Sequence, residues 1–321
     1  MRPPFEITPL AAALLAKIER HIGRYEGARV SSPNPMLRRS LRVRTIQASL
    51  AIEGNTLSEE QVTAVLEGKK VIAPERDLRE VKNAITCYER MVEWNPSSQK
   101  HLLAAHKIMT EGLLNRPGAW RSSGVGIVKG KVISHIAPPA DRVPGLVKSL
   151  FGWMQKEKAI PAPIKAAVCH YELEFIHPFA DGNGRMGRLW HSLILSHHHP
   201  LFSQIPIESS IRNHQANYYD VLGRCDKLGN STAFIEFSLE LTLDALAAVT
   251  ALPASTMTAA ARMENARSHF ATRPFSRKDY LAHFPGLSPA TASRDLQQAI
   301  VALTLTREGN KATTRYWFKE S

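Results

Sequence analysis

The sequence has few cysteines and no long apolar run. Its three cysteines, Cys87, Cys169 and Cys225, lie far apart in a chain of 321 residues and form no C-x-x-C pair. This pattern suggests neither a structural zinc site nor a disulfide framework, and it favours reduced thiols in a cytoplasmic protein. The longest early apolar run, residues 10–16, is too short to span a bilayer, so no membrane partner is expected.

Acidic residues are also scarce relative to basic ones. The chain has 41 lysines and arginines against 29 aspartates and glutamates, which gives a formal net charge of +12. Such a surface attracts nucleotides, nucleic acid or acidic proteins, and the charge does not choose between them. The charged fraction of 22% and the hydrophobic fraction of 44% are ordinary for a globular protein and argue against a disordered chain.

The chain is predicted to be mainly α-helical and to contain two or three domains. Apolar residues recur at three- and four-residue intervals, which predicts helices over residues 10–23, 37–52, 60–67, 76–94, 99–114, 144–156, 164–176, 185–197 and 233–250. One stretch, 125–135, breaks this period with β-branched residues that alternate around a Lys-Gly-Lys turn. This stretch is expected to form a β-hairpin.

The C-terminal part of the chain has a different pattern. A linker rich in small residues is predicted over 251–263, and a separate domain over 264–321. The elements of this domain are predicted to be a short helix, a turn, a longer helix and two strands, over residues 276–284, 285–287, 288–303, 303–307 and 314–318. This is the order of a winged helix-turn-helix, which predicts either DNA binding through residues 276–318 or contact with another protein.

The residues that suggest chemistry are concentrated in the segment 177–188, HPFADGNGRMGR. One helix is predicted to end near His177, because Pro178 cannot continue it, and another to begin near Gly184. The glycines between these helices allow successive backbone N–H groups to point the same way. Such a nest at a helix N-terminus binds phosphate through its amides and the helix dipole.

Four side chains complete the predicted site. Arg185 and Arg188 lie about one helical turn apart, and two guanidiniums beside a nest suit a polyphosphate. Asp181 is suited to hold Mg²⁺, and His177 can accept a proton near neutral pH. Each residue alone is better explained as part of a structural interhelical turn. Together, a base, a metal ligand, an anion cradle and a charge clamp indicate phosphoryl or nucleotidyl transfer.

The same segment resembles the signature of the Fic (Fido) family, H-P-F-x-[D/E]-G-N-G-R-x-x-R, at every fixed position. Residues 117–135 resemble the family's flap, and residues 210–219 resemble the stretch that closes its nucleotide pocket. The resemblance implies a Fic helical core over 111–250, preceded by an N-terminal helical region over 1–110. It also implies a nucleotidyltransferase, a protein adenylyltransferase (AMPylator) that moves AMP from ATP to a Ser, Thr or Tyr hydroxyl of a target protein.

The resemblance further implies a role for each matched residue. His177 would deprotonate the hydroxyl, Asp181 would hold the magnesium ion and Phe179 would anchor the loop. The positions implied in nucleotide binding are Gly182, Asn183, Gly184, Arg185 and Arg188 in the signature, Val132, Ile133, Ser134 and His135 in the flap, and Tyr218 and Asp226 in the adenine pocket. The flap would also align the target segment by strand addition. Asp226 departs from the family pattern, which often has Asn there.

Residues 49–54, SLAIEG, are similar to the family's inhibitory motif, [S/T]-x-x-x-E-[G/N]. Ser49 and Glu53 are about one helical turn apart and would share a helix face. The resemblance implies that Glu53 pairs with Arg188, takes the place of the γ-phosphate and inhibits transfer. This marks the subclass whose inhibitory helix precedes the signature.

Two other functions stay open at the level of the sequence. The chain could be a transcriptional regulator that binds DNA and uses the Fic core to sense a nucleotide, although intact His177 and Asp181 argue against it. Alternatively, the group transferred could be UMP, phosphocholine or phosphate. A homodimer that stabilises or displaces the inhibitory helix is also left open.

Overall fold

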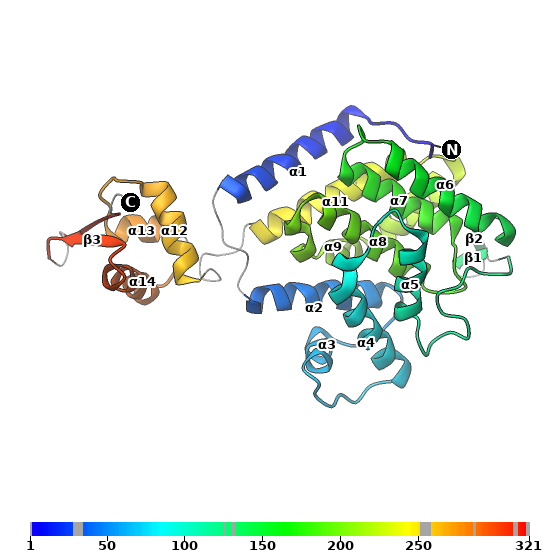
Figure 1. The fold of residues 1–321 in the computed structure, drawn as a ribbon, viewed down its shortest axis with the longest axis horizontal. Coiled ribbons are helices and arrows are strands. Elements are labelled where there is room, and N and C mark those ends of the chain that lie inside the picture. The colour runs from blue at the N-terminus through cyan, green and yellow to red at the C-terminus, as the bar shows by residue number, and fades with distance from the viewer. Residues whose placement is uncertain are drawn as a thin grey trace. The chain divides into compact units, whose positions relative to one another are not determined.

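A computed structural model of the chain describes residues 2–27, 35–124, 126–129, 132–250, 258–284, 287–310 and 314–318. The described part is mainly helical, with two small antiparallel hairpins (Figure 1). The mainly α fold expected from the sequence is therefore confirmed. None of the helices in these ranges combines the length and the apolar character needed to cross a membrane.

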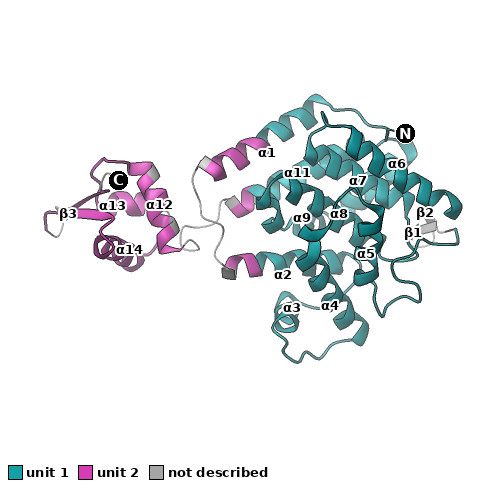
Figure 2. Ribbon diagram, in the orientation of Figure 1, with its two compact units in different colours: residues 1–18, 40–246 teal, residues 19–39, 247–321 magenta. Residues whose placement is uncertain are grey.

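The chain divides into two compact units, Met1–Ile18 with Ser40–Leu246, and Glu19–Arg39 with Ala247–Ser321 (Figure 2). The helices of the first 250 residues are α1 (Pro9–Gly27), α2 (Pro35–Ile52), α3 (Glu59–Leu66), α4 (Glu75–Arg90), α5 (Gln99–Met109), α6 (Val143–Lys156), α7 (Ala162–Ile176), α8 (Asn183–His198), α9 (Ile207–Asn213), α10 (Gln215–Leu228) and α11 (Thr232–Thr250). Single 3₁₀ turns also occur at η1 (Met91–Glu93), η2 (Ala140–Arg142) and η3 (Pro200–Gln204).

The centre of the first unit is the pair α7 and α8, which pack against each other. Both helices are buried around most of their circumference, as expected of helices inside a helical domain. Trp190 on α8 is fully buried. Its indole stacks with the indole of Trp94 and with the ring of Phe151, at centroid distances of 6.3 and 6.2 Å. This packing fixes α8, whose N-terminus carries the signature loop.

Two helices of the first unit, α9 and α10, fall outside the helical segments predicted from the apolar period. The reason is that α10 buries only three residues, Tyr218, Val221 and Cys225, so its apolar stripe is sparse. The predicted hairpin over 125–135 is present as β1 (Gly126–Lys129) and β2 (Val132–Ile136), with an irregularity between Ile127 and Val128.

The described residues 258–318 of the second unit form three helices and a hairpin: α12 (Ala259–Phe270), α13 (Arg277–His283), α14 (Pro289–Val301), β3 (Leu305–Glu308) and β4 (Arg315–Phe318). Ser276 and Ser288 cap α13 and α14 through their side chains. Backbone hydrogen bonds of 2.8 Å in both directions add Phe275 to the edge of the hairpin beside Tyr316. The winged-helix assignment of this order of elements stays a prediction.

Several boundaries differ from the sequence prediction. In the first unit, α5 ends at Met109 and not at residue 114, and α4 ends at Arg90 and not at residue 94. In the second unit, the sequence analysis predicts no helix at the position of α12. Helix α12 begins at Ala259, inside the predicted linker 251–263, whose residues 251–257 lie outside the described part of the chain. Helix α14 ends at Val301, two residues earlier than expected, and β3 begins at Leu305. Between them Leu303 takes a left-handed conformation with φ 58°, which neither a helix nor a strand accommodates.

A buried ion pair lies in the core of the second unit. Arg262 Nε and Nη2 donate to the two Asp295 carboxylate oxygens at 2.5 and 2.8 Å, and the Tyr280 hydroxyl donates to Asp295 Oδ2 at 3.2 Å. Both side chains of the pair are less than a tenth exposed. A buried pair of this kind contributes little over an apolar core, but removal of one partner strands the other charge.

We therefore expect Asp295→Ala to destabilise the second unit by about 3–5 kcal/mol, because Arg262 would remain buried without its counter-ion. Amide hydrogen exchange of the full chain should become faster over residues 259–318 and stay unchanged over residues 40–246. Glu308→Ala, at an exposed position of the same unit, is the matched control and should change the free energy of unfolding by about 0.5 kcal/mol or less. Equal exchange in Asp295→Ala and the parent would contradict the role given to this pair.

Candidate active site

The signature loop begins where α7 ends. The last residue of α7 is Ile176, and His177 takes a left-handed backbone conformation with φ 48° and ψ 62°. The His177 N–H still donates to the Leu173 carbonyl at 3.0 Å, so the residue closes the helix as it reverses the chain. A non-glycine residue in this region is strained, and surrounding contacts must hold it there. The half-buried His177 imidazole is thus set at a fixed point beside the loop.

Phe179 holds the loop in the core. Its ring is fully buried and stacks on His106 of α5 at a centroid distance of 3.7 Å and on Trp120 at 5.4 Å. The Asn183 side chain closes the same turn, because its Oδ1 accepts from Phe179 N and its Nδ2 donates to Phe179 O, both at 2.9 Å. The amide of Asn183 is therefore used inside the loop, and only its backbone N–H could contribute to anion binding.

The N-terminus of α8 forms an anion cradle. The first intrahelical hydrogen bond runs from Met186 N to the Gly182 carbonyl at 3.0 Å, so the N–H groups of residues 183–185 point out of the helix end. Gly182 has φ 83°, and an added β-carbon would lie 3.2 Å from Thr110 Cγ2, so this position requires glycine. Free amides and the positive end of the helix dipole favour a bound anion here.

A carboxylate of the chain itself lies against this cradle. Glu53 follows directly after α2, and a β-carbon at Gly184 would collide with its Oε1. The same Oε1 accepts from Arg188 Nη2 at 2.8 Å. Arg188 also binds α2 through Ser49, because its Nε donates to Ser49 Oγ at 3.1 Å and its Nη2 to the Ser49 carbonyl at 2.9 Å. Glu53 and Arg188, which are 135 positions apart in the sequence, are thereby joined at the N-terminus of α8.

Arg188 is a buried cation, and nearby carboxylates stabilise its charged form. Its side chain is 1% exposed, and burial by itself would lower its pKa. The nearby Glu53, Tyr218 and Glu174 outweigh this effect, so the pKa of Arg188 is raised. A guanidinium in this setting remains charged at every relevant pH and attracts whichever anion occupies the cradle.

Asp181 is the half-exposed carboxylate of the loop. Its Oδ1 accepts from Gly182 N at 2.6 Å and from Arg185 Nη2 at 3.4 Å, and its Oδ2 accepts from Arg76 Nη2 at 3.4 Å. No group of three or more His, Cys, Asp or Glu side chains with the arrangement of a metal site occurs among the described residues. A single carboxylate is nevertheless typical of Mg²⁺ that arrives with a nucleotide, because phosphates and water supply the other oxygens.

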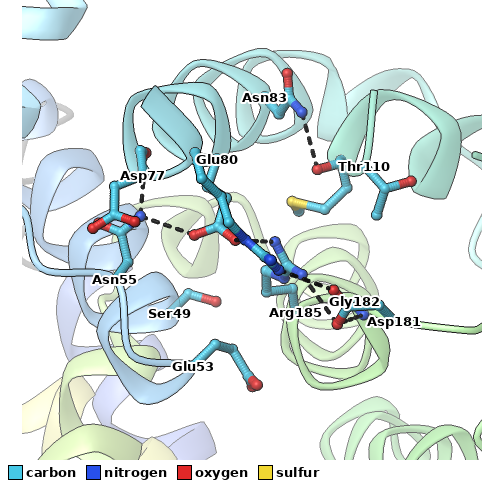
Figure 3. A network of polar contacts seen from close by, with 12 residues as sticks. Ser49, Glu53, Asn55, Asp77, Glu80, Asn83, Thr110, Asp181, Gly182 and Arg185 are labelled. Atoms are coloured by element: carbon cyan, nitrogen blue, oxygen red, sulfur yellow. Dashed lines mark hydrogen bonds and ion pairs between the residues drawn. The ribbon is translucent and has the colours of Figure 1, made fainter. Parts of the chain in front are cut away.

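A polar network connects the loop to the end of α2 (Figure 3). The Asn55 amide donates to the Asp77 carbonyl at 3.1 Å and to Glu80 Oε2 at 2.9 Å. Glu80 Oε1 in turn accepts from Arg185 Nη1 at 3.3 Å, and Arg185 reaches Asp181. Arg185 is 3% exposed, and its buried Nε has no hydrogen-bond partner in the part of the chain that the structure describes. The guanidinium of Arg185 thus binds the carboxylates of Glu80 and Asp181. The guanidinium of Arg188 binds Ser49 and Glu53 instead.

His106 is a site residue that the sequence analysis missed. Its Nδ1 accepts from Gly118 N and its Nε2 lies on the Asp181 carbonyl, both at 3.0 Å. Burial lowers the pKa of His106 to about 4, so the ring is neutral and, with Nδ1 an acceptor, carries its proton on Nε2. The only signal in the sequence is one histidine within an amphipathic helix, which is more often a core residue than a site residue.

The predicted adenine-pocket residues lie in a second polar cluster. Tyr218 is 1% exposed, and its hydroxyl lies 3.0 Å from His170 Nε2 and 3.5 Å from Glu174 Oε1. Asp226 Oδ1 accepts from the Tyr171 hydroxyl at 3.0 Å. The side chains of the predicted flap residues, Val132, Ile133, Ser134 and His135, lie outside the described residues, although the backbone of β2 is described and lies beside α10.

Glu174, in this cluster, makes the stability of the fold depend on pH. Burial raises its pKa to about 7, and the nearby Arg188 only partly counteracts this. A carboxyl whose pKa is higher in the folded than in the unfolded state contributes stability below the unfolded pKa. It loses this contribution as the pH rises through the folded pKa.

We expect Glu174→Gln to remove that loss. The melting temperature of the variant minus that of the parent should increase by a few degrees between pH 5 and pH 8, since glutamine never ionises. Glu75→Gln, at a side chain that is 93% exposed, is the control and should show no such trend. A difference that is independent of pH would mean that Glu174 is already ionised at pH 5.

Comparisons with known proteins agree with this geometry. The model of the Fic/DOC family matches residues 96–195, the segment that contains α5, the hairpin and the signature loop. Among curated proteins, the chain is 30% identical over 202 residues to protein adenylyltransferase fic-1 of Caenorhabditis briggsae, covering 59% of this chain and 37% of that protein. It is 29% identical over 156 residues to a probable protein adenylyltransferase of Aquifex aeolicus, covering 43% of this chain and 48% of that protein. The chain thus spans less than half the length of these curated relatives.

Solved structures extend the similarity to the complete chain. A Fic family protein from Desulfovibrio desulfuricans G20 is 39% identical with a TM-score of 0.75, and the match covers 100% of this chain and 99% of that one. The structure of residues 134–508 of Fic-1 from C. elegans is 24% identical with a TM-score of 0.58, covers 73% of this chain and 71% of that one, and shows a shared fold. Because the first similarity runs from end to end and includes the signature loop, the chain belongs to the Fic family.

Proposed function

We propose that the chain is a protein adenylyltransferase that transfers AMP from ATP to a hydroxyl group of a protein and releases pyrophosphate. The observation that carries this proposal is the head of α8, where free backbone N–H groups lie beside the buried Arg188, which pairs with a carboxylate at Gly184. The half-buried His177 stands at the other end of the same loop. The names of the curated relatives, protein adenylyltransferases, support this assignment.

In the proposed reaction, the cradle and Arg188 bind the phosphates of ATP and hold them in line. The target hydroxyl loses its proton to His177 as its oxygen forms a bond to the α-phosphorus. The bond from the α-phosphorus to the bridging oxygen of the β-phosphate breaks, and the electron pair leaves with pyrophosphate. The strained backbone of His177 supports this role, because it fixes the base relative to the cradle.

The residues present fit a magnesium ion that is brought in by the nucleotide. Asp181 is half-exposed at the edge of the cradle and is the residue that would hold it. When bound, the ion supplies neutralisation of phosphate charge. Arg76 and Arg185 neutralise the Asp181 carboxylate in the present structure, which supports a preference of this position for a cation.

Glu53 is proposed to inhibit this reaction. Its carboxylate lies against Gly184 at the edge of the cradle and pairs with Arg188, so we infer that it competes with the γ-phosphate for Arg188. ATP that binds beside Glu53 would have to place its phosphates elsewhere. Hydrogen bonds to a charged partner contribute about 1.5–3 kcal/mol, which corresponds to a roughly ten- to hundredfold bias toward the inhibited state.

The remaining assignments are narrower proposals. The three cysteines are free and buried, which supports the predicted cytoplasmic location. The winged helix, DNA contact through residues 276–318 and a homodimer stay predictions. AMP transfer is preferred over the DNA-binding alternative because the anion cradle, the base and the acidic loop residue occur together in the first unit.

The first prediction from the proposed function concerns labelling of the protein by [α-³²P]ATP in the presence of Mg²⁺. Glu53→Gly should raise auto-modification by roughly ten- to hundredfold, because the cradle and Arg188 become available to the γ-phosphate. His177→Ala in the Glu53→Gly background should lower it by about 10²–10⁴-fold through loss of the general base. The measurement is the radioactivity retained on the denatured protein, together with the mass of the adduct.

Labelling from [γ-³²P]ATP and [α-³²P]UTP is the control. Label from the γ-phosphate would indicate phosphate transfer, and stronger label from UTP would indicate UMP transfer. Equal label in the parent and in Glu53→Gly would disprove inhibition by Glu53. Absence of label in every variant would disprove nucleotidyl transfer to this chain.

The second prediction concerns the turn that presents Glu53. Asn55 fixes this turn to α4 through the Asp77 carbonyl and the Glu80 carboxylate. Asn55→Ala should therefore raise auto-modification severalfold, less than Glu53→Gly does. The double variant should label no more strongly than Glu53→Gly alone, because both changes act on one device. Independent, multiplicative effects would show that Asn55 acts by another route; Asn95→Ala, at an exposed position, is the control.

A further inference from the structure

Arg121 is a buried cation that carbonyl groups surround. It is 5% exposed, and its guanidinium donates to four backbone carbonyls in the described structure. Burial lowers the pKa of Arg121, and no carboxylate among the described residues counteracts this shift. A guanidinium has five donors in a rigid fork, so several fixed acceptors can hold it where a salt bridge is absent.

The four carbonyls come from two separate parts of the chain. Two belong to the end of α7, since Nε donates to the His177 carbonyl at 2.7 Å and Nη2 to the Ile176 carbonyl at 3.3 Å. The other two flank the hairpin: Nη1 donates to the Ser123 carbonyl at 2.8 Å, before β1, and Nη2 donates to the Pro138 carbonyl, after β2.

The backbone of Arg121 makes a further link. Its N–H donates to the Pro178 carbonyl at 3.0 Å, inside the signature loop. The residue therefore contacts three consecutive carbonyls, those of residues 176–178, which bracket the strained conformation of His177. Both ends of the β1–β2 hairpin are fastened to this same point.

We propose that Arg121 is a positioning residue that sets the distance between the β1–β2 hairpin and His177, and so decides whether a protein hydroxyl or water reaches the α-phosphorus. This inference rests on the proposed function. A target segment aligned on the hairpin presents its hydroxyl to His177 only if the hairpin is held at a fixed distance. Displacement by about 1 Å can cost roughly 100-fold in rate, whereas water needs no such alignment.

The variants Arg121→Lys and Arg121→Gln, each in the Glu53→Gly background, test this inference. Lysine keeps the charge but offers three donors on one nitrogen, so it cannot bridge carbonyls from both parts of the chain. The readout is the ratio of AMP bound to the protein to free AMP released from [α-³²P]ATP. Because both products come from folded enzyme, this ratio does not depend on how much of a variant is folded.

We expect the ratio to fall at least tenfold in both variants, with the KM for ATP within about twofold of the Glu53→Gly parent. Arg262→Lys is the matched control, because Arg262 is equally buried but pairs with Asp295 in the other unit. Its ratio should equal that of the parent. An unchanged ratio in the Arg121 variants, with ordinary labelling of the parent, overturns the inference and leaves the proposed function intact.

Hydrogen exchange supplies a readout without turnover. In Arg121→Lys, amides at residues 123–138 and 177–181 should exchange faster together, while those of α8 beyond its first turn stay protected. Exchange equal to that of the parent, or faster exchange throughout the first unit, contradicts the proposal. If Glu53→Gly forms neither bound nor free AMP, the proposed function fails and this inference falls with it.

Discussion

The charge of Arg188 is the constraint on which the site depends. The Arg188 guanidinium is 1% exposed and pairs with an anion, and the head of α8 places free backbone N–H groups beside it. In the present structure Glu53 fills this position. The proposed catalysis and the proposed inhibition by Glu53 therefore depend on which anion Arg188 binds, the phosphate of ATP or the Glu53 carboxylate. Whichever anion binds there satisfies the buried cation, so inhibition needs no separate pocket.

The surrounding fold serves to keep this site rigid. The packed pair α7 and α8 brings His177 and the cradle together across one loop. Phe179 stacks on the neutral His106, which also contacts the Asp181 carbonyl, and the Asn183 amide closes the loop. Such a site supplies fixed dipoles and a fixed base, and it would need little reorganisation during reaction. A left-handed histidine at this point is tolerated because its neighbours bind its backbone on both sides.

Local signals made much of the fold predictable. The helical period identified most of the helices, and the capping serines fixed the starts of α3, α13 and α14 within a residue. The period failed for α9, α10 and α12, and α10 buries only a sparse stripe. It also extended α14 two residues too far, because a left-handed Leu303 has no signal in a sequence. Periodicity reports burial, so elements that bury little are the ones it misses.

The sequence by itself determined the composition of the loop: its glycines, its base, its acid and two arginines one turn apart. These properties are local, since they depend on residues within a dozen positions of one another. Apart from the Glu53–Arg188 pair, which the family resemblance implied, only the tertiary structure decided which arginine meets which partner. Arg185 is turned to Glu80 and Asp181, Arg188 to Glu53, and Arg121 to the ends of the hairpin. The Arg185–Glu80 and Arg188–Glu53 pairs join residues 105 and 135 positions apart, and their distance is set by helix packing, which no local pattern encodes.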